Sequence, residues 1–233
     1  MKAQFHQDRL QAEIKKQGAD FMHFVDISQL PVEQRKGYPT AILIGIVLSK
    51  DYLRKVAGNP NYVGQMIENE QIETDEFHLA EIKTDQIADH IASYLSSIGF
   101  GAYSQSEDNI SKTGYYHTES LTTPLPHKTI AGLAGLGWIG KHNLLVTPAY
   151  GSAISMCTIL TDAPLKTIVK KPIVSRCGDC NSCEKICLVN AIKGTSWNYG
   201  IARDEIVDVF SCRTCFQCVV QCPWTQKYIN QQE

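Results

Sequence analysis

Hydrophobic positions in the first part of the chain follow a helical spacing in two places. Residues 5–18 and 77–98 repeat apolar side chains every three or four positions, which predicts two amphipathic helices. Gly18 and Gly99 stand where each helix would end, and glycine is the usual residue at a helix C-terminus. The segment 77–98 is the longest helix that we predict.

Other hydrophobic runs are short and rich in β-branched or aromatic residues, which predicts strands. The expected strands are residues 21–27, 41–48, 100–104, 144–147 and 153–161. The run 41–48 is apolar at all positions but one glycine, which favours a central strand buried on both faces. Helices and strands therefore mix in the first 160 or so residues, and we predict the α+β class.

Composition and charge narrow the classes of function. The chain has 233 residues, with 22 basic and 24 acidic side chains and a net charge of −2, so no large positive field is available to hold nucleic acid. The longest apolar run, 41–48, is far shorter than the roughly 20 residues that cross a bilayer. The N-terminus has no apolar signal core, and we therefore expect a cytoplasmic protein.

Eight of the nine cysteines fall between residues 177 and 222, in two copies of the spacing C-x2-C-x2-C-x3-C. A disulfide-stapled domain would be expected in an exported protein, and structural zinc would be the simplest metal alternative. Two tandem runs of four cysteines are instead typical of bacterial ferredoxins with two [4Fe–4S] clusters. Leu188 stands where a proline usually follows the fourth cysteine of the first run.

In that ferredoxin pattern the fourth cysteine of each run binds the cluster of the other run. The two runs therefore interlock. We predict one cluster on Cys177, Cys180, Cys183 and Cys222, and the other on Cys212, Cys215, Cys218 and Cys187. The ninth cysteine, Cys157, lies in a predicted strand, and we expect a buried core thiol.

A glycine-rich segment precedes the cysteines. Gly135, Gly137 and Gly140 satisfy G-x-G-x-x-G, and Asp162 follows at a distance suited to a dinucleotide site. The local order argues against such a site, because a helix precedes the glycines and a strand follows them, which reverses the required order. The alternative is a turn that packs tightly beside Trp138.

The segment 134–152, with the paired cysteine runs ending in Cys-Pro-Trp at 222–224, resembles the epoxyqueuosine reductase family, relatives of the corrinoid-dependent reductive dehalogenases. The resemblance implies an oxidoreductase with a nitroreductase-like cobalamin-binding domain over residues 1–165. It implies a ferredoxin-like domain with two [4Fe–4S] clusters over residues 166–233. A low-potential donor such as ferredoxin or flavodoxin would supply the electrons.

Residues that match the family's motif are the candidate corrinoid site. The resemblance assigns to it Gly137, Trp138, Gly140, Lys141 and Asn143, with Tyr150, Gly151 and Ser152 nearby. His142 lies inside the same loop and is a candidate cobalt ligand or a partner of one, and His127 is a further candidate.

The chain departs from the family in two respects. Family members carry Asp-Gly-Pro before the glycine loop, with the aspartate as proton donor, whereas residues 121–124 keep only the proline. Replacement donors would be Tyr115, Tyr116, His117 and Glu119, although packing or solvation would also explain these side chains. The sequence also ends at Glu233 without the family's helical-repeat extension, so we do not expect tRNA as a substrate.

Three hypotheses of function follow from these residues. The first is an iron–sulfur oxidoreductase that passes electrons to cobalamin and resembles a shortened epoxyqueuosine reductase. The second is an electron-transfer protein that reduces or handles a corrinoid without substrate chemistry of its own, which the missing aspartate favours. In the third, the first domain binds flavin instead.

Overall fold

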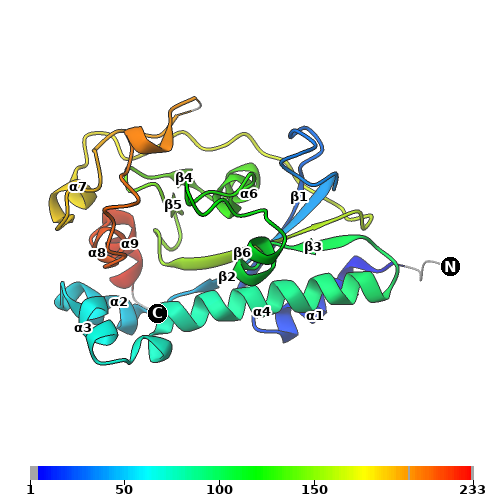
Figure 1. Ribbon diagram of the computed structural model, residues 1–233, viewed down its shortest axis with the longest axis horizontal. Coiled ribbons are helices and arrows are strands. Elements are labelled where there is room, and N and C mark those ends of the chain that lie inside the picture. The colour runs from blue at the N-terminus through cyan, green and yellow to red at the C-terminus, as the bar shows by residue number, and fades with distance from the viewer. Residues whose placement is uncertain (1–4, 199, 232–233) are drawn as a thin grey trace. The chain divides into compact units, whose positions relative to one another are not determined.

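Four strands form the main sheet of the computed structural model, which describes residues 5–198 and 200–231 (Figure 1). Their order across the sheet is β1 (Phe21–Asp26), β2 (Thr40–Val47), β6 (Ile154–Thr161) and β3 (Ala102–Ser104). β1 runs antiparallel to β2, and β3 runs antiparallel to β6. The interior strand β2 is buried along most of its length, so the prediction of a central buried strand is confirmed.

Helices α1 (Gln7–Lys16) and α4 (Glu76–Ser97) pack on this sheet through one hydrophobic core. Leu10 of α1 and Ile91 of α4 meet Ile42 of β2 and Cys157 of β6 there, all with no exposed surface. The predicted helices and the predicted core thiol are therefore confirmed. Burial raises the pKa of Cys157, so this thiol stays protonated and inert.

The remaining elements are short. The glycine segment lies between α6 (His127–Leu133) and a two-stranded sheet of β4 (Trp138–Ile139) and β5 (Leu145–Val146). A helix thus precedes the glycines and a strand follows them. This is the order that argues against a dinucleotide site. The other short elements are α2 (Lys50–Gly58), α3 (Tyr62–Glu68), a 3-10 turn (Ile72–Thr74), α5 (Glu107–Lys112), α7 (Ser182–Ile186), a 3-10 turn (Arg203–Glu205), α8 (Gln217–Val220) and α9 (Pro223–Ile229).

The chain forms two compact units that each combine distant segments. The first contains residues up to Ile46, Ala80–Gly135 and Ser155–Lys171, and the second contains Val47–Leu79, Leu136–Ile154 and the residues from Pro172 onward. The mixed α and β class is thus confirmed. The domain boundary at residue 165 and the nitroreductase-like and ferredoxin-like character of the two domains stay predictions.

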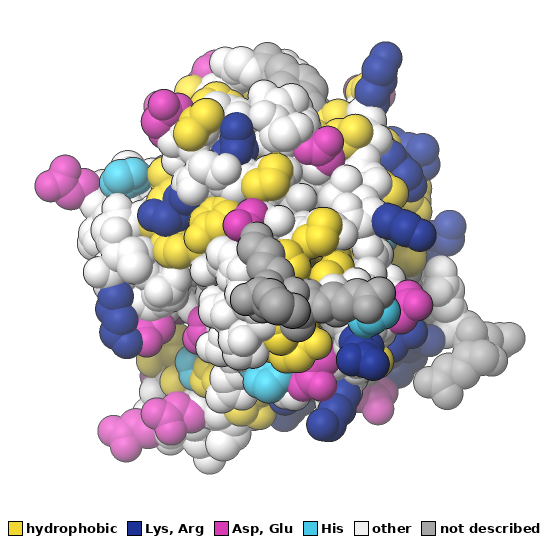
Figure 2. Space-filling model, turned by 90° about the vertical axis from the view of Figure 1, so that its right-hand side faces the viewer, with side chains coloured by type: hydrophobic (Ala, Val, Ile, Leu, Met, Phe, Trp, Pro, Cys, Tyr) yellow, Lys and Arg dark blue, Asp and Glu magenta, His cyan; other side chains and the backbone are white. Residues whose placement is uncertain are grey.

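The surface carries charges of both signs. Figure 2 shows basic and acidic side chains on the same face, with apolar side chains between them. This mixture agrees with the nearly balanced count of 22 basic and 24 acidic residues. Within residues 5–198 and 200–231, no helix has the length and apolar character needed to span a bilayer.

Candidate metal centre and the adjoining loop

Four thiols line one cavity of about 250 Å³ in the second unit. Three come from the first cysteine run, Cys177, Cys180 and Cys183, and the fourth is Cys222, the last cysteine of the second run. Cys183 and Cys222 are 8% and 7% exposed, so the inner wall is screened from water. The structure therefore brings together the four residues that we predict as ligands of one cluster.

The pKa shifts of the buried thiols show that the two cysteine runs lie close together. Burial, followed by the nearby Cys177 and Cys222 thiols, raises the pKa of Cys183 to about 11. For Cys218, burial is again the main cause of a raised pKa, and Cys215 and Cys212 add to it. Cys183 and then Cys187, both of the first run, make smaller contributions at Cys218, so thiols of the two predicted sets lie near each other.

All nine cysteines are free, and the described residues contain no group of three or more His, Cys, Asp or Glu side chains that could hold one metal ion. A tetrahedral zinc site would draw its sulfurs to about 2.3 Å from the metal. An iron–sulfur cube instead takes one thiolate at each of four separate irons.

Short helices fix the direction of the inner cysteines. Cys183 lies in α7 and Cys218 in α8, while Cys222 is the residue that caps the start of α9. Pro223 follows as the first residue of α9, where its fixed φ and its missing N–H cost nothing. The Cys-Pro-Trp sequence thus starts a helix directly after the last thiol.

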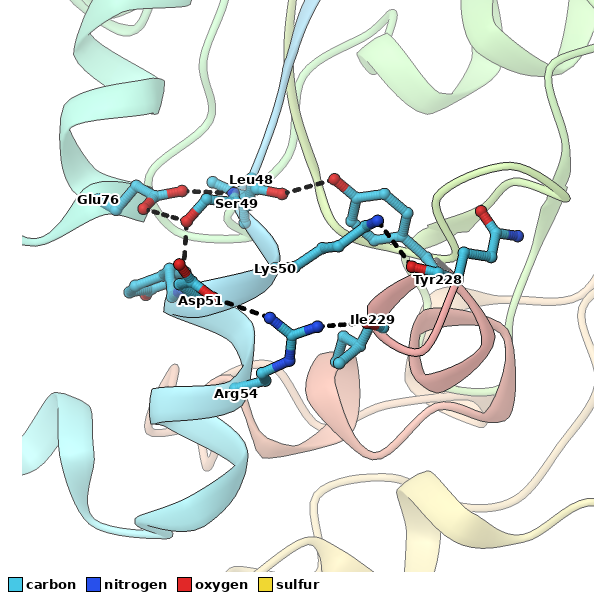
Figure 3. A network of polar contacts seen from close by, with 10 residues as sticks. Leu48, Ser49, Lys50, Asp51, Arg54, Glu76, Tyr228 and Ile229 are labelled. Atoms are coloured by element: carbon cyan, nitrogen blue, oxygen red, sulfur yellow. Dashed lines mark hydrogen bonds and ion pairs between the residues drawn. The ribbon is translucent and has the colours of Figure 1, made fainter. Parts of the chain in front are cut away.

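Helix α2 anchors the segments that carry Cys218 and Cys222. The buried Gln217 side-chain amide donates to the Val56 carbonyl at 2.9 Å, which ties α8 to α2. Around α9, the Arg54 guanidinium donates to the Ile229 carbonyl at 2.9 Å, and the Tyr228 hydroxyl donates to the Leu48 carbonyl at 3.1 Å (Figure 3). A helix more than 150 residues earlier in the sequence therefore positions two of the candidate ligands.

The beginning of α2 is itself fixed by side chains. Ser49 caps the helix by accepting a hydrogen bond from the Tyr52 N–H at 3.1 Å, and its hydroxyl donates to the Glu76 carboxylate at 2.7 Å (Figure 3). Sequence reasoning did not identify α2 or its role in the site.

The glycine loop meets the cysteine cavity. Lys141 and His142 line the cavity, and the Lys141 ammonium donates to the Cys180 carbonyl at 3.0 Å. Trp138 packs with Cys177 and Cys222. Three further cavity residues, Arg176, Pro223 and Trp224, are not among the predicted site residues, although each lies beside a motif cysteine or the proline that follows it.

The loop glycines make room for the chain itself. A Cβ at Gly137 would lie 2.0 Å from the Val146 carbonyl oxygen, and one at Gly140 would lie 2.8 Å from the His142 ring. Gly151 has φ +59°, and its Cβ would lie 2.3 Å from the Thr225 backbone nitrogen. Close packing of the chain therefore accounts for these glycines, as in the alternative of a tightly packed turn.

His142 uses both ring nitrogens inside the protein. The Leu144 N–H donates to Nδ1 at 3.2 Å, so the proton resides on Nε2, which lies 3.3 Å from the Ser152 hydroxyl. In this arrangement the ring offers no lone pair to cobalt. Its role here is to join two parts of the loop.

The other loop residues also contact the protein. The Ser152 N–H donates to the Thr225 hydroxyl at 3.0 Å, and the Tyr150 ring packs edge-on against Tyr228 with centroids 5.4 Å apart. Asn143 adopts φ +63°, a conformation that asparagine tolerates better than most residues. Their assignment to a corrinoid site stays a prediction.

The candidate proton donors lie in the first unit and differ in their surroundings. Tyr115 is 6% exposed, its hydroxyl donates to the Gln34 carbonyl, and burial raises its pKa to about 12. Tyr116 is half-buried, whereas His117 and Glu119 are exposed. Tyr115 is therefore engaged in packing, and the roles of the other three stay predictions.

Comparisons of sequence identify similar proteins. No family model matches the sequence. An epoxyqueuosine reductase of Aliivibrio fischeri is 31% identical over 136 residues, covering 52% of this chain and 36% of the relative. One of Vibrio cholerae is 36% identical over 135 residues with the same coverage. The matches thus span about a third of the length of these relatives.

Comparisons of structure show the same fold in larger proteins. A catabolic reductive dehalogenase, NpRdhA, has a TM-score of 0.63 at 19% identity, covering 93% of this chain and 31% of that one. The epoxyqueuosine reductase of Bacillus subtilis has a TM-score of 0.54 at 14% identity, covering 94% of this chain and 65% of that one. Part of the sequence is thus similar to epoxyqueuosine reductases, and the fold is shared with epoxyqueuosine reductases and reductive dehalogenases.

Proposed function

We propose that this protein is an oxidoreductase in which two [4Fe–4S] clusters pass electrons to a cobalamin. The observation that carries the proposal is the cavity lined by Cys177, Cys180, Cys183 and Cys222. Three thiols from one run and one from the other are the ligand set of an interlocked two-cluster ferredoxin. When bound, such clusters supply one-electron transfer at low potential.

The residues around this cavity suit a negatively charged cluster. Lys141 and Arg176 bring positive charge to the wall, and their charge offsets that of four thiolates. The Trp138 and Trp224 rings meet edge-on at 4.9 Å and 76°, and together they shield the inner side from water. Solvent exclusion and nearby charge are the means by which a protein sets a cluster's potential.

The proposal of cobalamin rests on similar proteins. One solved structure of the same fold, with a TM-score of 0.59, is a reductive dehalogenase whose title refers to B12-dependent dehalogenation. The loop glycines of this chain do not add support, because the chain's own atoms fill the space beside them. Cobalamin is therefore proposed as the electron acceptor, with ferredoxin or flavodoxin as the donor and flavin as the alternative acceptor.

A second candidate function is delivery of electrons to a corrinoid without substrate chemistry. The family's aspartate is absent from residues 121–124, and Tyr115 is held by the Gln34 carbonyl. A chain without a proton donor could still reduce a cofactor. The two functions are separated by single substitutions of Tyr116, His117 and Glu119. Electron delivery would be favoured if each variant kept the turnover of any accepted substrate and the rate of cobalt reduction.

Binding of tRNA is not part of the proposal. A solved epoxyqueuosine reductase of the same fold was crystallised with a tRNA-Tyr stem loop, which is a property of that protein. The net charge of −2 offers this chain little attraction for phosphates. Titration of the protein with a tRNA-Tyr stem loop at low salt tests whether it binds tRNA. Saturable binding would contradict the expectation that it does not.

The cluster proposal is tested by anaerobic reconstitution of the full chain. We expect about eight irons per chain, and about four in the Cys222→Ser variant, because the cluster of the first run loses the one ligand that the second run supplies. Cys157→Ser, in the core of the first unit, is the matched control and should keep about eight. A colourless protein, or one that binds zinc in place of iron, would refute the proposal.

The acceptor is tested on the same reconstituted protein. Added cobalamin should shift its visible spectrum towards the form without an axial base, because both ring nitrogens of His142, the candidate cobalt ligand, already contact the protein. An unchanged spectrum would leave flavin or another acceptor, and flavin binding can be followed by its own fluorescence.

A further inference from the structure

Phe216 lies between Cys215 and Cys218 and has a left-handed backbone, with φ +66° and ψ 0°. Both cysteines are predicted ligands of the cluster of the second run, which is the one predicted on Cys212, Cys215, Cys218 and Cys187. Phe216 is the only aromatic residue with a positive φ among residues 5–198 and 200–231. A bulky L-residue is disfavoured in this conformation, for which glycine is the usual residue. The fold therefore holds a strained residue directly beside two candidate ligands.

The ring of Phe216 is held by aromatic side chains of the second unit. It is buried, and its centroid lies 4.5 Å from that of Phe77 and 6.2 Å from that of Tyr52. The Tyr52 hydroxyl donates to the Asp75 carboxylate at 3.1 Å, which fixes the position of the Tyr52 ring. Burial of the Phe216 ring among these side chains offsets the cost of its backbone conformation.

The cysteine spacing does not by itself require a left-handed residue at this place. Asn181 takes the equivalent position in the first run, between Cys180 and Cys183, and its φ is −130°. The two runs have the same spacing, so the packing of the Phe216 ring selects the conformation in the second run. Strained residues persist only where their surroundings fix them, and they are concentrated at functional sites. The strain at Phe216 therefore points to a role in the second run.

We propose that Phe216 is a positioning residue, whose left-handed backbone places Cys215 and Cys218 as ligands of one cluster. This inference rests on the proposed function. The angles of Phe216 are close to those of the third residue of a type II turn, which reverses the chain. Helix α8, which carries Cys218, starts directly after it. The cluster requires the handedness of the backbone at position 216, and the buried ring supplies the energy that maintains it.

The test compares Phe216→Gly with Phe216→Val in the full chain after anaerobic reconstitution. Both substitutions remove the ring, but glycine adopts a positive φ freely, whereas the β-branched valine is strongly disfavoured there. We expect Phe216→Val to release about half of its iron to a chelator about tenfold faster than Phe216→Gly. If the ring acted only by filling space, valine would retain iron better than glycine, because it leaves a smaller cavity.

Phe210→Gly and Phe210→Val are the matched controls. Phe210 precedes the second run by two positions, but its side chain is 68% exposed and its φ is not positive. Iron release should therefore be the same in both control proteins. A preference for glycine over valine at Phe210 as large as that at Phe216 would overturn the inference, because it would not depend on a left-handed residue.

A second pair of proteins keeps the volume of the side chain constant. A synthetic peptide of residues 212–233 is joined at Cys212 to residues 1–211, with Phe216→Ala made as either L-alanine or D-alanine. D-alanine favours the left-handed conformation that L-alanine disfavours, because the two are mirror images. We expect about eight irons in the protein with D-alanine and about four in the protein with L-alanine.

The results separate this inference from the proposed function. If the unaltered protein binds about eight irons but Phe216→Gly releases iron as fast as Phe216→Val, the inference is overturned and the proposed function stands. If neither of these variants folds, the alanine pair decides. Equal iron contents in the two alanine proteins, including none in either, would overturn the inference. Absence of iron–sulfur clusters from the unaltered protein would overturn both.

Discussion

The Lys141 ammonium donates a hydrogen bond to the Cys180 carbonyl at 3.0 Å, which links the glycine loop to the first cysteine run across 39 positions of sequence. Lys141 and Cys180 also share the wall of the four-thiol cavity. The loop that the sequence resemblance assigns to a corrinoid is thus in direct contact with a predicted cluster ligand. Through this hydrogen bond the glycine loop supports the first cysteine run, independently of any contact with a corrinoid.

Replacing Lys141 should weaken retention of one cluster. Lys141→Met keeps most of the aliphatic chain but removes the hydrogen bond and the positive charge, a loss of about 1.5 kcal/mol or roughly tenfold. We expect about tenfold faster release of half of the iron to a chelator. Lys227→Met is the matched control, since Lys227 is exposed and lies over the Trp224 ring outside the cavity lining. Equal release from both variants would contradict the role of Lys141.

Asp75 stabilises the start of the longest helix. It is 2% exposed, and its Oδ1 accepts hydrogen bonds from the Phe77 and His78 N–H groups at 3.0 and 3.1 Å and from the Tyr52 hydroxyl at 3.1 Å. Losing a cap and leaving Tyr52 without a partner should lower the free energy of unfolding of Asp75→Ala by about 2–3 kcal/mol. Tyr52→Phe should cost about 1 kcal/mol.

Urea unfolding followed by circular dichroism measures these changes. Asp51→Ala is the control, because Asp51 pairs with Arg54 at the surface, and exposed ion pairs contribute about 0–1 kcal/mol. A loss in Asp75→Ala no larger than that of Asp51→Ala would show that the cap is not a main support of the helix.

Long periodic elements, and the four thiols that line one cavity, could be predicted from the sequence. The eight-residue apolar run that became β2 and the helical spacing of α4 carry their own signals, and the cysteine spacings predict which four thiols meet. The role of α2 could not be predicted, because Val56 of α2 accepts a hydrogen bond from Gln217 of α8, which lies 161 positions further along the sequence.

The glycine loop shows a second limit. Its motif is visible in the sequence, but the reason for Gly137 is the approach of the Val146 carbonyl, which only the paired strands β4 and β5 bring to that place. The Trp138 indole N–H is buried without a hydrogen-bond acceptor among residues 5–198 and 200–231, and this too is a property of packing. Sequence patterns thus located the loop, whereas its contacts decide what its residues do.

Stability should fall as the pH drops because of His127. Its Nδ1 lies 2.9 Å from the Thr158 hydroxyl, and desolvation lowers the pKa of the ring to about 4. The ring in an unfolded chain has a pKa of about 6.5, so between pH 6.5 and 4 the unfolded chain binds more protons than the folded one. The contribution of neutral His127 is therefore fully present above about pH 6.5, and it declines by up to about 3 kcal/mol as the pH falls through this window.

His127→Gln removes the titrating ring and keeps a polar group near Thr158. The difference in free energy of unfolding between the native sequence and His127→Gln should shrink or reverse from pH 7.5 to pH 4.5, because only the native ring must stay neutral against a rising proton concentration. His117→Gln, which replaces an exposed histidine of the same unit, should show no such trend. Urea unfolding at five pH values in that range measures all three proteins, and parallel curves for the native sequence and His127→Gln would show that the ring is not held neutral by the fold.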